Sequence, residues 1–149
     1  MMEKNFFSQN KGYQSPEENW RNNVKRILGE NFVDKALGFQ ELDIEEFKDF
    51  NNKIQEFVSS IARDITSSSL RKIYDLIKSS KNTSDLLFTL PYIAYMVGKE
   101  DNMRKKNALG KLYVVLKDSI ERIKNDEKQV KNIKKFAEAL IAYQKFYED

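Results

Sequence analysis

The sequence predicts an all-α protein, a compact bundle of about five to six helices. Three observations lead to this fold class. Apolar residues recur three and four positions apart along most of the 149 residues, which is the period of an amphipathic helix. The chain contains only 5 Gly and 2 Pro, too few for a protein built from strands and tight turns. Short polar residues that cap helices stand directly before several apolar stretches.

The first helix is expected to begin at a capping box. Ser15 suits the N-cap, Pro16 suits the first helical position, and the Glu18 side chain can accept a hydrogen bond from the backbone N–H of the cap residue. Trp20 begins the apolar stripe, and we expect its indole to anchor the core rather than to stack on a ligand. Residues 31–37 could form a short helix that follows.

A long helix is expected to begin at the N-cap Asp43 and to continue to the turn at Thr66. Its apolar residues keep the helical period, and we expect one continuous buried stripe: Ile44, Phe47, Phe50, Ile54, Phe57, Ile61 and Ile65. The acidic residues of its first turns favour the positive end of the helix dipole. Because no Asp-x-Asp-x-Asp-Gly loop accompanies them, we do not expect a metal site there.

The stretch that follows, ITSSSLRKIYDLIK, is predicted to be the helix that organises the chain. Thr66 or Ser67 can cap it. Four apolar residues then share one face: Leu70, Ile73, Tyr74 and Ile77. Arg71 and Lys78 fall on one margin of that face and Lys72 on the opposite side. Such a helix can dock on a core and still offer cations to a ligand.

The remaining chain predicts further helices. One opens at Ser84 and Asp85 and ends near Gly98, and Pro91 within it should kink or split it. A charged loop, KEDNMRKKN, is expected over 99–107. The last two helices carry the stripes Leu109, Leu112, Leu116, Ile120, Ile123 and Val130, Ile133, Phe136, Ala137, Leu140, Tyr143, Tyr147.

The domain organisation is expected to be simple. Residues 1–14 have the composition of a polar, flexible N-terminal tail and lack the apolar segment of a signal peptide. Residues 15–149 are predicted to form a single helical domain. No segment approaches about 18 consecutive apolar residues, so we expect no membrane partner and a cytoplasmic location.

Composition excludes several classes of function. The chain has no Cys and no His, which removes disulfides, thiolate nucleophiles, the commonest general base and the commonest metal ligand. It also lacks a Gly-rich phosphate loop, a nucleophile motif and zinc-ligand spacing. We therefore expect a protein that is not an enzyme, with no catalytic residues, no metal and no cofactor.

The net charge of +3 conceals an asymmetry along the chain. Residues 1–64 carry 9 Lys and Arg against 12 Asp and Glu, a balance of −3. Residues 65–149 carry 17 against 11, a balance of +6. A basic half favours a polyanionic partner, and unlike halves equally permit head-to-tail self-association. Uneven charge is also ordinary in a Lys-rich protein.

Binding to a nucleic-acid backbone is the chemistry that remains. Lys and Arg neutralise phosphates without reading sequence, and recognition of an RNA duplex by shape needs no aromatic platform. The candidates flank the turns around the organising helix: Arg63, Arg71, Lys72, Lys78, Lys99, Arg104, Lys105 and Lys106. The alternative for Arg71 and Lys72 is a purely local role, since ion pairs with Asp75 at i+4 and i+3 imply no function.

Three stretches resemble, in order, parts of one known family. They are ITSSSLRKIY at 65–74, PYIAYMVGKE at 91–100 and FAEALIAYQKFY at 136–147. The first is similar to the Thr/Ser-rich turn and basic helix of the small subunit of the type III-A CRISPR effector, the Csm small-subunit family. The second resembles that family's helix ending in an aromatic residue, Gly and a basic residue, and the third its C-terminal Glu-Ala-x-x-Ala-Tyr helix. Lys99 and Gln144 depart from the Arg and His expected there, and the first 60 residues carry little of the resemblance.

The resemblance implies a non-catalytic subunit of an RNA-guided antiviral complex. In that family several copies stack head to tail in a filament that flanks the guide RNA and its target and supports their pairing through backbone contacts. Cleavage belongs to neighbouring subunits. The implied partners are guide RNA, target RNA, other effector subunits and further copies of the chain, as a filament or a dimer.

Two other functions stay open from the residues alone. One is a helical adaptor that binds only protein. The other is a DNA-binding regulator, because the turn at Thr66 between two helices superficially resembles a helix-turn-helix. The second helix of that pair, however, is expected to bury Ile73, Tyr74 and Ile77, and the turn lacks the Gly that the motif usually contains.

Overall fold

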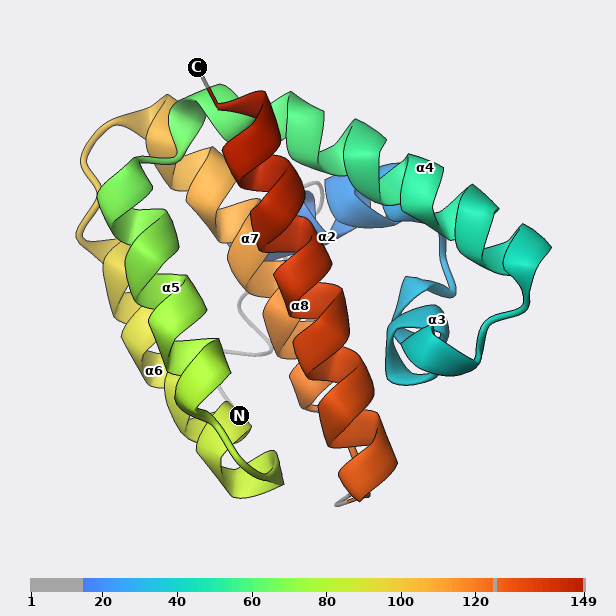
Figure 1. Cartoon of the computed structure of the whole chain (residues 1–149). Coiled ribbons are helices and arrows are strands. Elements are labelled where there is room, and N and C mark those ends of the chain that lie inside the picture. Colours follow the sequence, from blue (N-terminus) through green and yellow to red (C-terminus); the bar gives the residue numbers. More distant parts are fainter. Residues whose placement is uncertain (1–14, 125, 149) are drawn as a thin grey trace, which may run out of the picture.

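The computed structural model describes residues 15–124 and 126–148, and within them it is all-α, as predicted (Figure 1). These residues form the α-helices α2 (Pro16–Leu28), α3 (Phe32–Leu37), α4 (Ile44–Ile61), α5 (Ser67–Ser79), α6 (Thr83–Gly98), α7 (Met103–Ile120) and α8 (Glu127–Tyr147). Two 3-10 helices, η1 (Phe39–Glu41) and η2 (Ala62–Asp64), precede and follow α4. The tail predicted at residues 1–14 lies outside the described part of the chain.

Local capping sets the helix starts where the sequence predicts them. The Ser15 hydroxyl accepts a hydrogen bond from the Glu18 N–H at 3.2 Å, and the Glu18 carboxylate accepts one from the Ser15 N–H. The same reciprocal box at Asp43 begins α4. Thr66 caps α5 by accepting from the Ser69 N–H at 3.1 Å. Each cap satisfies backbone donors that the first helical turn leaves unpaired.

The bundle is built around α7 and α8, which lie beside one another at its centre (Figure 1). Helix α2 packs on α7, α4 packs on α8, and α5 lies between α6 and α8. The buried apolar side chains form a contiguous core cluster, in which the rings of Phe50 and Phe136 stack at 5.7 Å between centroids. Buried Asn132 of α8 joins η1 to this core, since it accepts from the Gln40 N–H and donates to the Leu37 carbonyl.

The first turns of α4 differ from the prediction of a continuous buried stripe. Ile44 is 74% exposed and Phe47 is 39% exposed, so the buried stripe begins at Phe50. In Figure 1 the N-terminal end of α4 extends away from α8, because the two helices cross at a steep angle. Helices that cross in this way contact each other over a few turns only, and the ends beyond the crossing stay exposed.

Between residues 83 and 107 the structure differs from the predictions in two respects: the helix is not split at Pro91, and the charged loop is shorter. Helix α6 begins after the N-cap Asn82 and continues through Pro91 without a break. Pro91 and Leu87 are both exposed, so water can reach the Leu87 carbonyl that the proline leaves unbonded. The charged loop is shorter than expected, because Asn102 caps α7 by accepting from the Lys105 N–H at 3.0 Å. The basic residues 104–106 therefore form the first turn of a helix.

None of the described helices has both the length and the apolar character needed to cross a bilayer.

Candidate nucleic-acid interface

One end of the bundle, at the top left of Figure 1, brings together the end of α6, the start of α7, η2 and the start of α5. We call this region the basic end and define it by five of the predicted cations: Arg63, Lys99, Arg104, Lys105 and Lys106. All are exposed except Lys106, which is half-buried. The sequence places these cations in three separate segments, and the packing of η2 against α7 joins them.

Two contacts hold η2 in this position. The Arg104 guanidinium lies 3.7 Å from the Asp64 carboxylate, which links α7 to η2. Gln144 of α8 is buried and donates from Nε2 to the Ala62 carbonyl at 2.8 Å. Gln144, which departs from the histidine expected by resemblance, therefore holds the backbone beside Arg63 and does not itself face solvent.

The helix starts at the basic end are unusual in their charge. The first turns of α5 and α7 contain no acidic residue, whereas those of α2, α4, α6 and α8 do. In α7 that turn holds Arg104, Lys105 and Lys106, and cations at a positive helix end are unfavourable by about 0.3–1 kcal/mol each. Helix stability does not explain these residues, whereas an anion bound at this end would offset the repulsion.

Acidic residues share the basic end and limit its charge. Asp64 pairs with Arg104, and Glu100 and Asp101 lie in the loop between α6 and α7. Glu148 lies at the start of α5, where it accepts from the Ser67 hydroxyl and from Lys145 Nζ at 2.8 Å. The Lys145 hydrogen bond is the main cause that lowers the pKa of Glu148. The positive charge is therefore concentrated on the cations that extend from the first turn of α7.

The predicted cations of α5 lie on two different sides of that helix, as their spacing indicates. Arg71 lines a groove between α5 and α8, together with Tyr74 and Lys145. Lys72 lines a groove between α5 and α6. In the described part of the chain neither forms an ion pair with Asp75 within 4 Å, so the pairs expected at i+4 and i+3 are not present in the structure.

Lys78 is separated from the basic end. It lies in the last turn of α5, and its ammonium group is 5.6 Å from the centre of the Tyr74 ring. The helix axis rises about 1.5 Å per residue, so Lys78 lies about 10 Å further along α5 than Arg71. The eight candidates thus form one cluster at an end of the bundle, two cations one turn into α5, and one distant residue.

Two features were not found by sequence reasoning. One is an ionic network between α2 and α7, in which Arg21 binds Asp118 through two hydrogen bonds of 2.7 and 2.8 Å. Its residues are 97 positions apart, so no local pattern predicts the pair. The other is a row of exposed aromatic residues on α6: Phe88, Tyr92 and Tyr95. Their i, i+4, i+7 spacing opposite the buried stripe was the available signal.

The described residues contain no cluster of three or more side chains suited to hold a metal ion.

Comparison with known proteins assigns the chain to a family. A family model described as Csm2 Type III-A matches residues 41–149, nearly three quarters of the chain. The matched region contains α4 to α8 and every candidate cation, and it leaves out α2 and α3. No curated protein and no solved structure matches significantly.

Proposed function

The chain belongs to the Csm2 type III-A family, and from this membership we propose that it binds the backbones of guide and target RNA without reading sequence and without cleaving them. The family comprises small subunits of the type III-A CRISPR effector, so the chain has a place beside the other subunits of that complex. The proposal itself consists of three statements: the chain binds RNA, its copies stack in a filament, and it does not catalyse a reaction.

The observation that carries the proposal is the cation-bearing first turn of α7 at the basic end. Arg104, Lys105 and Lys106 extend from a helix N-terminus, where backbone N–H groups and the helix dipole add to their positive potential. Phosphates are the anions that such a surface suits, and contacts to phosphates carry no sequence information. Binding of this kind requires no side chain that acts as a general acid or base and none that holds a catalytic metal ion.

Charge supports the stacking of copies. The sequence carries a balance of −3 over residues 1–64 and of +6 over residues 65–149, and attraction between unlike charges on two copies would favour a head-to-tail contact. Such an arrangement would align the basic ends of successive subunits along one RNA.

The turn before α5 argues against the DNA-binding alternative. It consists of the 3-10 helix η2 followed by Ile65 and Thr66, and it lacks the Gly that the turn of a helix-turn-helix often contains.

Salt dependence of RNA binding tests the proposal. We would measure the affinity of the full chain for a labelled RNA duplex between 50 and 200 mM salt by fluorescence anisotropy. The double variant Lys105→Gln/Lys106→Gln should bind more weakly at every sequence and show a salt slope lower by about 1.5–2, as expected for two lost phosphate contacts.

The matched control removes two charges at the other end of the bundle, with Lys128→Gln/Lys131→Gln in the first turns of α8. This variant should keep the wild-type affinity and slope. Absence of RNA binding at 50 mM salt would favour the adaptor that binds only protein, and tighter binding to DNA of the same sequence would favour the regulator.

A further inference from the structure

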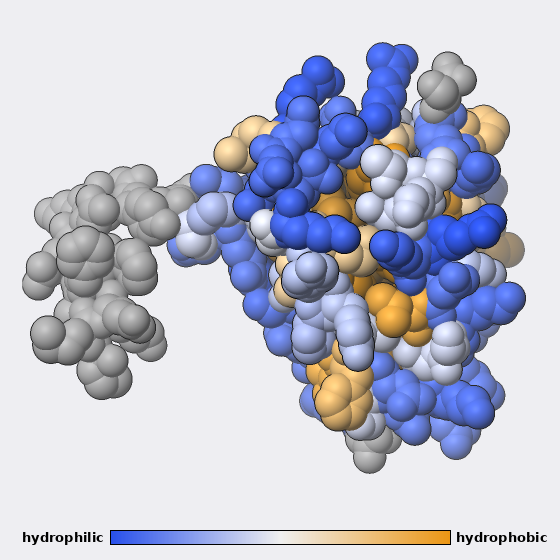
Figure 2. All heavy atoms as spheres, turned by 90° about the vertical axis from the view of Figure 1, so that its left-hand side faces the viewer, coloured by the Kyte–Doolittle hydropathy of each residue, from blue (hydrophilic) through white to orange (hydrophobic). Residues whose placement is uncertain are grey.

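Helix α6 presents a row of aromatic side chains to solvent. Phe88 is 69% exposed, Tyr92 63% and Tyr95 68%, while the opposite face of the helix buries its apolar residues in the core. Figure 2 looks onto this side of the molecule and shows pale and orange residues between blue hydrophilic ones. Three large exposed rings in one row indicate a binding surface rather than scattered surface residues.

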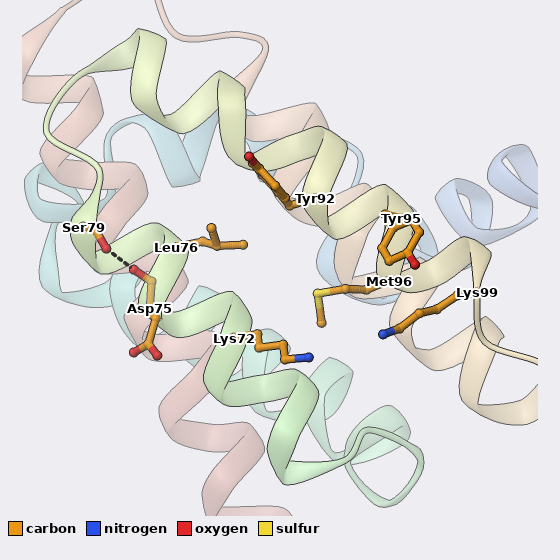
Figure 3. Close-up of a pocket in the computed structure, with 8 residues that line it drawn as sticks. All are labelled: Lys72, Asp75, Leu76, Ser79, Tyr92, Tyr95, Met96 and Lys99. Atoms are coloured by element: carbon orange, nitrogen blue, oxygen red, sulfur yellow. Dashed lines mark hydrogen bonds between the residues drawn. The ribbon is translucent and has the colours of Figure 1, made fainter.

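A groove of about 390 Å³ lies between this row and α5 (Figure 3). Leu76 and Met96 line its apolar part. Lys72 of α5 and Lys99, the C-cap residue of α6, extend their ammonium groups toward one another across it (Figure 3). The ammonium group of Lys99 also lies 5.5 Å from the centre of the Tyr95 ring.

The charges around the groove favour an anionic ligand. Asp75 is the acidic residue that lines it, and its carboxylate points away from both lysines (Figure 3). Within the described residues neither Lys72 nor Lys99 has a carboxylate partner within 4 Å. The groove therefore combines two lysines with two exposed tyrosine rings. Neither lysine pairs with an acidic residue in the described part of the chain.

We propose that this groove binds unpaired bases of single-stranded RNA. The rings of Tyr92 and Tyr95 stack on two bases, and Lys72 and Lys99 hold the adjoining phosphates. Aromatic rings that stack bases, beside cations that follow the backbone, are the combination that single-strand binding requires. Paired bases inside a duplex offer no free face to such rings, so the groove discriminates between the two forms of RNA.

The three rings lie on successive turns of one face of α6. Tyr92 and Tyr95 are separated by about 4.5 Å of axial rise, and Phe88 and Tyr92 by about 6 Å. The proposal places one unpaired base on each tyrosine ring. This inference rests on the proposed function and adds to it a second site, distinct from the first turn of α7.

The test compares one RNA sequence as a labelled single strand of 12 nucleotides and as a duplex. The variant Tyr92→Ala/Tyr95→Ala should bind the single strand about tenfold or more weakly, because base–aromatic stacking is lost. Its salt slope should stay unchanged and its affinity for the duplex should change less than twofold. Tyr92→Phe/Tyr95→Phe keeps the rings and should bind as the wild type does. Phe146→Ala removes a ring of α8 that is 75% exposed and is the matched control.

Each contrary result has a distinct meaning. Equal single-strand affinity for wild type and Tyr92→Ala/Tyr95→Ala, with the fold retained by circular dichroism, overturns the inference and leaves the proposed function in place. An equal loss for single strand and duplex also overturns it. Loss of self-association in sedimentation, with RNA affinity unchanged, would assign the row to a protein contact instead. If Lys105→Gln/Lys106→Gln bound duplex normally while the tyrosine variant lost single-strand binding, the assignment of RNA binding to the first turn of α7 would fail, whereas the inference on the α5–α6 groove would stand.

Discussion

Trp20 of α2 lies against α7 at a position where only a glycine leaves room for it. The indole N–H donates to the Asn107 carboxamide at 3.0 Å. A Cβ atom added to Gly110 would lie 2.5 Å from the indole ring, well inside the contact distance of carbon atoms. Gly110 is buried in the middle of α7, where glycine normally weakens a helix. Close approach of the two helices explains its presence.

We expect Gly110→Ala to destabilise the protein by about 1–2 kcal/mol, because the overpacking cost exceeds the gain in helix propensity. Urea unfolding followed by circular dichroism measures this change. Gly98→Ala is the matched control, since a Cβ there meets nothing within 4 Å, and it should be neutral or slightly stabilising. Trp20→Phe should reduce the cost of Gly110→Ala, and additive effects of the two changes would contradict the explanation.

The ionic network between α2 and α7 has a defined pH dependence. Glu17 accepts hydrogen bonds from Lys117 Nζ at 2.7 Å and from Arg21 at 2.9 Å. The Lys117 contact is the main cause that lowers the pKa of Glu17 below its ordinary value of 4.5. A carboxylate with a lowered folded-state pKa contributes its full stability above pH 4.5 and loses it as the pH falls through the folded-state pKa.

Glu17→Gln should therefore lower the free energy of unfolding at pH 7 by about 0.5–1 kcal/mol, a modest amount because solvent screens this partly exposed network. The difference from wild type should shrink as the pH falls below 4.5. Urea unfolding at pH 7, 5, 4 and 3 gives the profile. Glu56→Gln, at an exposed position of α4, is the control and should show no such difference. If the loss of unfolding free energy in Glu17→Gln were the same at every pH in this range, the contribution of Glu17 would not be electrostatic.

At the scale of elements, α5 is held on both sides and offers a different cation to each neighbouring groove. Arg71 faces the groove toward α8 and Lys72 the groove toward α6. Because both are exposed and unpaired with Asp75 within the described residues, neither contributes much to holding the helix in place.

We expect Arg71→Ala to cost about 0.5 kcal/mol or less in stability and to weaken RNA binding uniformly across sequences, with a salt slope lower by about one contact. Arg71→Lys should restore only part of the affinity, because an ammonium group cannot form the bidentate fork to phosphate. Filter binding at two salt concentrations measures both. Asp75→Ala should leave binding intact or slightly stronger. If Arg71→Ala bound RNA with wild-type affinity, Arg71 would not be part of the interface. The assignment of the basic end would be unaffected.

At the scale of the whole molecule, α2 and α3 lie outside the region matched by the family model, yet they are packed into the same core. Trp20, Val24, Leu28 and Phe32 are buried within the cluster that extends to Leu140 of α8. We therefore expect the described helices to unfold as one unit, in agreement with the single helical domain that the sequence predicts.

Leu28→Ala tests this cooperativity and should lower stability by about 2–5 kcal/mol, because it leaves a cavity in the core. Trp20 is the single tryptophan of the chain, so its fluorescence reports on α2, while circular dichroism reports on all helices. The two transitions should coincide in wild type and shift together in the variant. Leu28→Met conserves volume and should cost less than about 1.5 kcal/mol. A fluorescence transition that precedes the dichroism transition would show that α2 unfolds separately.

The sequence by itself determined the fold class, most helix boundaries and the family. Capping boxes at Ser15 and Asp43, and the cap at Thr66, depend on residues three positions apart, so the local sequence contains all the information for them. The buried stripes of α7 and α8 were predictable for the same reason, since a helical period is a local property. The boundary at Asn102 was missed because the charged residues after it resemble a loop.

Only the tertiary structure decided which side chains come together. Arg21 meets Asp118, and Trp20 lies over Gly110, because α2 packs on α7 across a long separation in sequence. The packing of η2 against α7 gathers Arg63 with the first turn of α7 and leaves Lys78 apart, while the angle between α4 and α8 exposes Ile44. Helix packing angles arise from the shapes of surfaces distant in sequence, so no local pattern contains them.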